Sequence, residues 1–204
     1  MKKIFLMAAV AVFGFTQVNA QEGGDFGFDE GDIFIEGSVG FSSTNNKNTD
    51  VKSNTVLVMP KAGYFITDKF AAGVGLGFGS YKQETGSTIN DDESSFAAGL
   101  FARYYFLELG NRFKTYSEFG VGYGSTNDKI ADAKLNTISA GLDLGVNYFV
   151  TEKIAVTFAL TDILSFKSKK ADASGAKPVS SFNFGVGSVN NPFATASFGI
   201  LFKL

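Results

Sequence analysis

The chain has 204 residues, among them 24 glycines and 23 phenylalanines, and it contains neither cysteine nor histidine. The missing cysteines exclude disulfides and thiolate chemistry, and the missing histidines remove the commonest general base and the commonest metal ligand. The formal net charge of −2 and the 19% of charged residues give no basic surface for a nucleic acid.

The first 20 residues have the three parts of a secretory signal peptide. Lys2 and Lys3 form a basic start, residues 4–15 form an apolar run, and Val18-Asn19-Ala20 precedes the expected cleavage point. The apolar run is too short to span a bilayer as a helix, and a buried N-terminal helix is the alternative. We predict a signal peptide over residues 1–20, followed by a flexible acidic lead-in over residues 21–31.

From residue 32 onward, apolar and polar residues alternate with the period of two that is typical of a β-strand with two different faces. In SFAAGLFARYYF (95–106), for example, Phe96, Leu100 and Tyr104 share one face and Arg103 lies on the other. Eight such segments are predicted, at about 32–43, 53–66, 69–81, 94–106, 112–125, 135–150, 153–165 and 194–204. Most of them reach or exceed the 9–11 residues that a tilted strand needs to cross a bilayer.

The connections between these segments alternate between short and long. The short ones are TDK (67–69), LELGNR (107–112) and TEK (151–153), and the long polar ones are SSTNNKNTDVK (42–52), KQETGSTINDDES (82–94), STNDKIADAK (125–134) and the stretch after Phe166. Short turns at one end and long loops at the other are typical of a transmembrane barrel.

An aromatic pattern accompanies the short turns. GYFITDKFA (63–71) returns as NYFVTEKIA (147–155), and YYF (104–106) precedes the third short turn. Aromatic side chains are enriched where a membrane protein meets the lipid headgroups. We therefore expect these aromatic residues to lie at headgroup depth beside the short turns.

With these motifs the chain resembles the small eight-stranded outer-membrane β-barrel proteins of Gram-negative bacteria, the OmpA-like barrel domain and its OmpW-like relatives. The resemblance covers the mature chain and rests on PKAGYFITDKFAAGVGLGF (60–78), YFVTEKIAV (148–156) and the ending SFGILFKL (197–204). It implies an all-β fold, an eight-stranded antiparallel up-and-down transmembrane β-barrel, as a single domain over residues 32–204.

The resemblance also implies the location and the partners. A monomer is expected in the outer membrane of a Gram-negative bacterium, surrounded by outer-membrane lipid and lipopolysaccharide. In the family, alternating hydrophobic residues of the last strand are recognised by the barrel assembly machinery. Here those positions are filled by Phe198, Ile200, Phe202 and Leu204.

If the apolar faces meet lipid, the opposite faces turn inward and carry charges of both signs. The inward charges proposed as a network are Glu36, Lys61, Arg103, Glu118 and Asp143. Eight strands leave an interior just wide enough for side chains to fill, and an isolated charge there is costly. We therefore predict a salt-bridged plug in which Arg103 and Lys61 pair with some of the three carboxylates; a charged conduit is the alternative.

The residue types exclude most catalytic sites. Without histidine no Ser–His arrangement can form, and there is neither a zinc ligand set nor a spaced Asp/Asn calcium loop. We predict no enzymatic activity, no cofactor and no metal, and we interpret the protein as a structural or surface-interaction barrel with long polar extracellular loops. One alternative is an OmpW-like channel for small apolar solutes, which an apolar lateral opening would favour. Another is a soluble lipocalin-type barrel with its apolar face inward.

Three places depart from regular alternation. Pro60 lies inside the second segment, where a residue without an N–H group suggests a β-bulge. The apolar parity of the seventh segment slips at Asp162. SFNFGVGSV (181–189) also alternates, but a ninth wall strand would leave the C-terminus on the wrong side. We assign it to the fourth long loop or to an extension of the last hairpin above the membrane.

Overall fold

The computed structural model describes residues 26–185 and 196–204. Within these residues nine strands form one antiparallel sheet: β1 (Ile33–Asn46), β2 (Val51–Phe65), β3 (Phe70–Thr85), β4 (Thr88–Leu109), β5 (Phe113–Asp128), β6 (Ala133–Phe149), β7 (Ile154–Ala171), β8 (Val179–Phe184) and β9 (Ala196–Lys203). Across the same residues there is no helix with the length and apolar character needed to cross a membrane. The predicted signal peptide, residues 1–20, lies outside the described residues.

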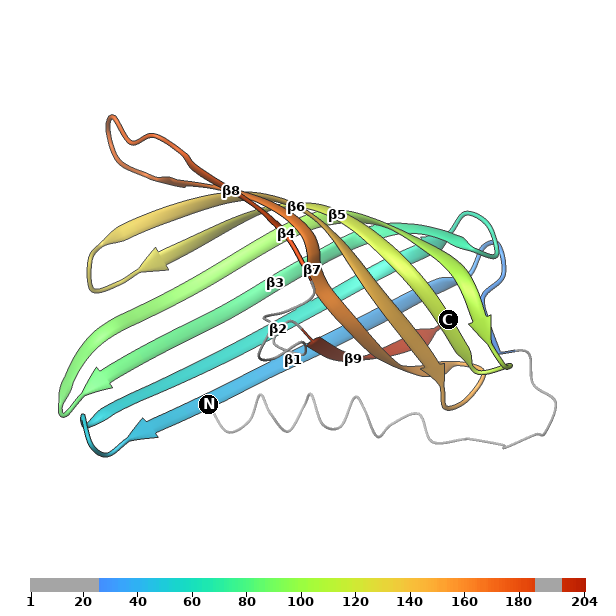
Figure 1. Ribbon diagram of the computed structural model, residues 1–204, viewed down its shortest axis with the longest axis horizontal. Helices are drawn as coiled ribbons and strands as arrows, with labels where there is room; N and C mark the ends of the chain where they lie inside the picture. Colours follow the sequence, from blue (N-terminus) through green and yellow to red (C-terminus); the bar gives the residue numbers. More distant parts are fainter. Residues whose placement is uncertain (1–25, 186–195) are drawn as a thin grey trace.

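Eight of these strands close into a barrel (Figure 1). Strands β1 to β7 pair in chain order, and β9 pairs with β7 on one side and with β1 on the other. The predicted eight-stranded antiparallel up-and-down barrel is confirmed. The short turns and the C-terminus lie at one end of the barrel, and the β1–β2, β3–β4 and β5–β6 hairpins extend from the other end (Figure 1). We call these the short-turn end and the hairpin end.

The strand β8 lies outside the ring of eight and shares an edge of β7 with β9. β9 pairs with β7 over Ile154–Leu160, and β8 pairs with the farther part, Leu164–Lys169. β8 is therefore the second arm of the β7–β8 hairpin. It covers residues 181–184 of the stretch assigned to the last loop or hairpin, while residues 186–189 of that stretch lie outside the described residues.

Three of the predicted long loops are continued strands, so the prediction of loops is wrong there. Only residues 47–50, 86–87 and 129–132 turn, and the polar residues on either side pair across the hairpins. Asp50, Gly86 and Asp132 adopt positive φ angles of 52°, 60° and 48°, a conformation that Gly and Asp tolerate better than most residues. Serine- and threonine-rich strands with no apolar face resemble loops in the sequence, although their backbones continue the sheet.

The large apolar side chains face outward all around the barrel. Val74, Leu100 and Phe119 are 52%, 61% and 49% exposed on neighbouring strands, whereas most inward positions are small, polar, charged or buried aromatic. A continuous exposed apolar band suits the hydrocarbon of a bilayer and not water. The soluble lipocalin-type alternative, which needs the apolar face inward, is therefore wrong.

The adjacent aromatic residues of the repeated motif lie on opposite faces of the barrel wall. Tyr64 and Tyr148 are exposed on the outer face, in agreement with the predicted aromatic belt, but Phe65 and Phe149 are fully buried in the interior. Successive side chains of a strand point to opposite faces, so two adjacent aromatic residues cannot both face the headgroups. The prediction of headgroup depth is wrong for these two phenylalanines and also for Tyr105 of the third motif, which is buried in the interior.

The structure describes the last part of the predicted lead-in, residues 26–31. Residues 26–31 fold back on the short-turn end, where the Gly31 amide donates a hydrogen bond of 2.9 Å to the Phe65 carbonyl. The ring of Phe28 is buried and stacks on Phe65 with centroids 4.2 Å apart. The packing of the Phe28 ring into the short-turn end of the barrel stabilises this position of the segment. Residues 21–25 lie outside the described residues.

The two irregular strand positions behave differently. At Pro60 the prediction of a bulge is wrong, because Val58↔Phe78 and Lys61↔Gly75 keep one register and only Met59 and Pro60 lack partners on β3. At Asp162 the slipped parity is a true bulge: the step from Leu142 to Leu144 on β6 faces the longer step from Leu160 to Leu164 on β7. Asp162 itself has a φ of 57°.

Candidate functional site

A layer of charges crosses the barrel interior around Arg103. This side chain, on β4, is fully buried between Glu36 of β1 and Glu118 of β5. Arg103 Nη1 and Nη2 donate to the two oxygens of Glu36 at 2.8 and 3.1 Å, and Nε donates to Glu118 Oε2 at 2.7 Å. The planar guanidinium group thus contacts two carboxylates at once, a geometry in which charge-assisted hydrogen bonds are strong.

A second cation completes the layer. Lys61 of β2 forms an ion pair with Glu118 Oε1, so that Glu118 lies between Lys61 and Arg103. Two cations and two carboxylates then balance in a region that is largely closed to water. This balance is the condition under which buried charges are tolerated, since the desolvation of an uncompensated charge is expensive. We call Arg103, Glu36, Glu118 and Lys61 the charged layer.

Uncharged polar side chains extend the charged layer toward the short-turn end. The Thr157 hydroxyl donates to Glu36 at 3.2 Å, and the Asn147 amide donates to Thr157 at 2.7 Å. The Tyr105 hydroxyl donates to the Asn147 side-chain oxygen at 2.6 Å. The sequence analysis did not include Asn147 or Thr157. Their inward parity was visible, but their height along the barrel axis depends on the strand register.

Aromatic rings fill the interior around the charged layer and between it and the short-turn end. The guanidinium carbon of Arg103 lies 4.1 Å from the ring centre of Tyr116 and 5.0 Å from that of Phe34, and cation–π attraction adds to the ion pairs. The Tyr116 ring occupies space left by Gly145, where a Cβ atom would collide with it. The buried cluster consists of Phe28, Phe34, Phe65, Phe101, Tyr105, Tyr116 and Phe149 with the apolar residues Ala71, Ala155 and Leu201. We call this cluster and the charged layer together the plug.

Asp143 lies beside the charged layer but does not belong to it. One of its oxygens accepts a hydrogen bond of 2.8 Å from the backbone amide of Asp162 at the β7 bulge. The Asp162 carboxylate is itself paired with Lys167 at 2.7 Å. Asp143 makes no ion pair within residues 26–185 and 196–204. Four of the five residues predicted as an interior network are therefore in direct contact, and the fifth is separate.

On the hairpin side of the plug the interior is hollow. A cavity of about 550 Å³ is lined by Gly75, Gly77, Gly99, Gly120 and Gly122 together with polar residues from β6 and β7. Glycines leave space there because no side chain projects from them into the narrow lumen. Lys61, Asp143, Lys167 and Lys169 contribute charged groups to its wall. We call this cavity the vestibule.

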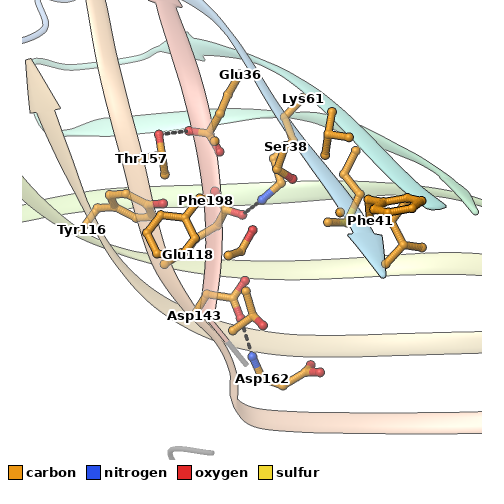
Figure 2. A pocket seen from close by; sticks show the side chains of 18 residues that line it. Glu36, Ser38, Phe41, Lys61, Tyr116, Glu118, Asp143, Thr157, Asp162 and Phe198 are labelled. Atoms are coloured by element: carbon orange, nitrogen blue, oxygen red, sulfur yellow. Dashed lines mark hydrogen bonds and ion pairs between the residues drawn. The ribbon is translucent and has the colours of Figure 1, made fainter. Parts of the chain in front are cut away.

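A second cavity, of about 660 Å³, leads from the charged layer to the barrel wall between β1 and the β7–β9 pair. Its inner end is lined by Glu36, Glu118 and Asp143, and its outer part by Val39 and Phe41 of β1, Leu57 and Met59 of β2 and Phe198 of β9. Figure 2 shows the three carboxylates along one side of the cavity, with Phe41 and Phe198 among the surrounding side chains. We call it the lateral cavity.

The lateral cavity lies beside the part of β1 that has no partner on the β9 side among the described residues. β1 pairs with β9 only over Phe34–Ser38, and in the described part of the chain Val39–Asn46 has a partner on the β2 side alone. The vestibule and the lateral cavity share Met59, Lys61, Glu118, Asp143 and Asp162 in their linings. The two cavities therefore adjoin next to the charged layer.

Sequence reasoning did not identify the apolar residues of the lateral cavity. Phe101, Tyr105 and Leu201, the inward apolar residues noted in the sequence, are all buried in the plug. Leu57 and Met59 lie within the apolar run 56–59, in which no alternation distinguishes the two faces. The register with β1 assigns them inward, because Met59 faces Ser38 and Leu57 faces Gly40.

Comparison with known proteins agrees with this architecture. The family model described as outer membrane protein beta-barrel domain matches residues 7–188, while no curated protein matches the chain by sequence. Among solved structures, outer membrane protein OprG of Pseudomonas aeruginosa is 17% identical, with a TM-score of 0.51 over 87% of this chain and 98% of that one.

Two further structures are also similar. Outer membrane protein W of E. coli is 17% identical over 86% of this chain and 99% of that one, with a TM-score of 0.45. The N-terminal β-barrel domain of OprF from P. aeruginosa is 15% identical over 87% and 100%, with a TM-score of 0.42. At these identities the likeness to OprG concerns the fold alone. The match of the family model over most of the chain shows that this protein belongs to the outer membrane protein beta-barrel domain family.

Proposed function

We propose that this protein is a non-enzymatic outer-membrane barrel that is sealed along its axis and has a structural or surface-interaction role. The plug is the observation that carries the proposal. Arg103 is fully buried between Glu36 and Glu118, and aromatic rings surround it. A continuous water-filled path past this level would expose these groups, whereas their burial leaves no room for one.

The extended hairpins support a role at the cell surface. β4 has 22 residues and β3 and β5 have 16 each, well above the 9–11 residues that cross a bilayer. In bacterial outer-membrane barrels the short turns face the periplasm and the long connections face outward. The hairpin end would then extend from the membrane and present polar strands to the surroundings of the cell.

The residue types and their contacts support the absence of catalysis. The chain has no histidine and no cysteine, so that nucleophile–base pairs built on either residue are excluded. Of the three interior carboxylates, Glu36 and Glu118 are held by Arg103 and Lys61. Carboxylates that neutralise buried cations are not available as a general acid and base.

A second candidate function is the lateral passage of small apolar solutes. The specific observation in its favour is the lateral cavity, which adjoins the vestibule and ends at the part of β1 that lacks a described partner on this side. Leu57, Met59 and Phe41 give its outer part an apolar lining. A solute that entered the vestibule from the hairpin end would be stopped by the plug. It would then leave through the lateral cavity into the outer leaflet of the membrane.

The remaining partners are also proposals. Phe198 and Ile200 of β9 and Leu204, which directly follows β9, have exposed side chains, as an alternating recognition signal for the barrel assembly machinery requires. Phe202 occupies the fourth position of this signal. Outer-membrane lipid and lipopolysaccharide would cover the apolar band, and the protein would be exported through its N-terminal signal peptide and act as a monomer.

The sealed axis predicts an absence of steady ion conductance. Purified, refolded protein in planar bilayers should give no stable open steps, because the charged layer closes the lumen. Folded protein is verified by its different gel migration before and after boiling, and protein-free detergent serves as the control. Stable steps whose number rises with the amount of folded protein would contradict the proposal.

The charged layer predicts an asymmetric rescue. Arg103→Ala should lower the free energy of unfolding by roughly 3–5 kcal/mol, because it leaves buried carboxylates without their partner. Glu118 still has Lys61, whereas Glu36 keeps only uncharged partners. Adding Glu36→Gln to Arg103→Ala should therefore restore more stability than adding Glu118→Gln. Urea unfolding of the refolded variants in lipid vesicles measures this, and equal rescue by the two changes would refute the assignment.

Lateral passage predicts that the two faces of β1 respond differently to one bulky side chain. Gly40 faces the cavity beside Leu57, and Gly37 faces outward with nothing within 4 Å of a Cβ atom. Gly40→Phe should slow the uptake of a small apolar dye into proteoliposomes, because it fills the opening, and Gly37→Phe should leave uptake unchanged. Equal uptake by the wild type and both variants would exclude the lateral route.

A further inference from the structure

We propose that the lateral cavity binds a small amphiphile with a cationic head group, and that Asp143 is the residue that selects the charge. The inference rests on the lateral function proposed above, since the ligand would occupy the same route. It names the chemistry of the solute: a short apolar chain lying among Leu57, Met59 and Phe41, and a positively charged head beside the Asp143 carboxylate.

The first argument is the charge balance of the cavity wall. The acids that line the lateral cavity are Glu36, Glu118, Asp143 and Asp162. Glu36 and Glu118 are neutralised by Arg103 and Lys61, and Asp162 is paired with Lys167. Asp143 has no cation within ion-pair distance among the described residues, and Lys61, the cation in the lining of this cavity, is in contact with Glu118. Asp143 is therefore the acid of this lining whose carboxylate a cationic head group could still contact.

The second argument is the position of that charge. Asp143 lines both the lateral cavity and the vestibule, so that a head group at the junction of the two would contact it from either direction. The hydrogen bond of 2.8 Å from the Asp162 amide holds one carboxylate oxygen in place. In Figure 2 Asp143 lies next to Glu118 at the inner end of the cavity, away from Phe41.

The third argument is the division of the cavity into a charged end and an apolar end. Leu57 and Met59 line its lumen side, and Val39, Phe41 and Phe198 line its outer end at the wall. The volume of about 660 Å³ falls within the range of small-molecule sites. A cation in such surroundings needs a counter-charge, which Asp143 provides, and an anionic head group would be repelled by the same carboxylate.

A metal ion is a poorer occupant of this site. Divalent cations require several oxygen ligands, and the described acids that come together closely enough to hold one are Asp91, Glu93 and Asp128 on the hairpins. Asp143 offers a single carboxylate without a convergent partner. An organic cation needs only one counter-charge and also benefits from the apolar lining.

The test compares three probes that share a chain length and differ in head group: hexyltrimethylammonium, hexanol and hexanoate. Binding to the refolded full-length protein in uncharged maltoside micelles is measured by isothermal titration calorimetry, with empty micelles subtracted. We expect hexyltrimethylammonium to bind about tenfold more tightly than hexanol, as one partly buried ion pair allows, and hexanoate to bind least tightly. Equal affinities, or the reverse order, would overturn the inference.

Variants separate the head group from the chain. Asp143→Asn should lower the affinity for hexyltrimethylammonium to that for hexanol without changing hexanol binding, and Asp143→Glu should keep the preference. Asp172→Asn removes the same charge from the exposed β7–β8 hairpin and should have no effect. Leu57→Ser should weaken all three probes alike. Each variant is first shown to be folded by its different gel migration before and after boiling.

The outcomes distinguish this inference from the function on which it rests. If Gly40→Phe slows the uptake of an apolar dye but Asp143→Asn leaves the order of the probes unchanged, lateral passage stands and the selection of a cationic head group is wrong. If none of the probes binds and Gly40→Phe has no effect on uptake, both are wrong. A loss of preference in Asp143→Asn alone supports the inference.

Discussion

The burial of one guanidinium group is the constraint on which the interior of this barrel depends. Arg103 is fully buried, and a charge in that position has to be neutralised by partners within hydrogen-bond distance. Glu118 comes from the neighbouring strand β5, but Glu36 comes from β1, which does not pair with β4. One ion pair therefore joins neighbouring strands of the wall, and the other crosses the lumen. Together they determine the height along the barrel axis at which charged side chains fill the interior.

That level divides the interior into two unlike halves. Toward the short-turn end, inward aromatic residues and Phe28 of the preceding segment pack into a continuous cluster. Toward the hairpin end, glycines leave a hollow. Beside this hollow, β1 continues past Ser38, where its described pairing with β9 ends, and the lateral cavity reaches the wall there. The position of one charged layer thus separates the packed half of the interior from the half that holds the vestibule.

The alternation of residues predicted the strands and their faces well, because a period of two is a local property of the sequence. It assigned Glu36, Lys61, Arg103, Glu118 and Asp143 to one face, and the structure has the first four in direct contact. It could not give their heights along the axis, since these depend on the register between strands. For that reason it could not distinguish Asp143 from the other four, and it missed Asn147 and Thr157, which complete the hydrogen bonds to Glu36.

Other features were not predictable because they depend on tertiary context. The polar halves of β1 to β6 read as loops, since neither of their faces is apolar, although their backbones pair to the tips of the hairpins. The lateral cavity is lined by residues of β1, β2, β5, β6, β7 and β9, and no local pattern reveals which strands meet there. Phe28 lies in an acidic, glycine-rich stretch that has the composition of a flexible segment, and its burial depends on the aromatic cluster to which it adds.

The central claim, a lumen that is open to solvent on one side of the charged layer and closed on the other, is tested most directly by cysteine accessibility. The chain has no cysteine of its own, so single cysteines can replace Ser139, which lines the vestibule, and Ala155, which is fully buried in the cluster. Each protein is reconstituted and exposed to a small charged thiol reagent on both sides of the membrane. The account predicts rapid modification at position 139 and none at position 155. Equal rates at the two positions would contradict it.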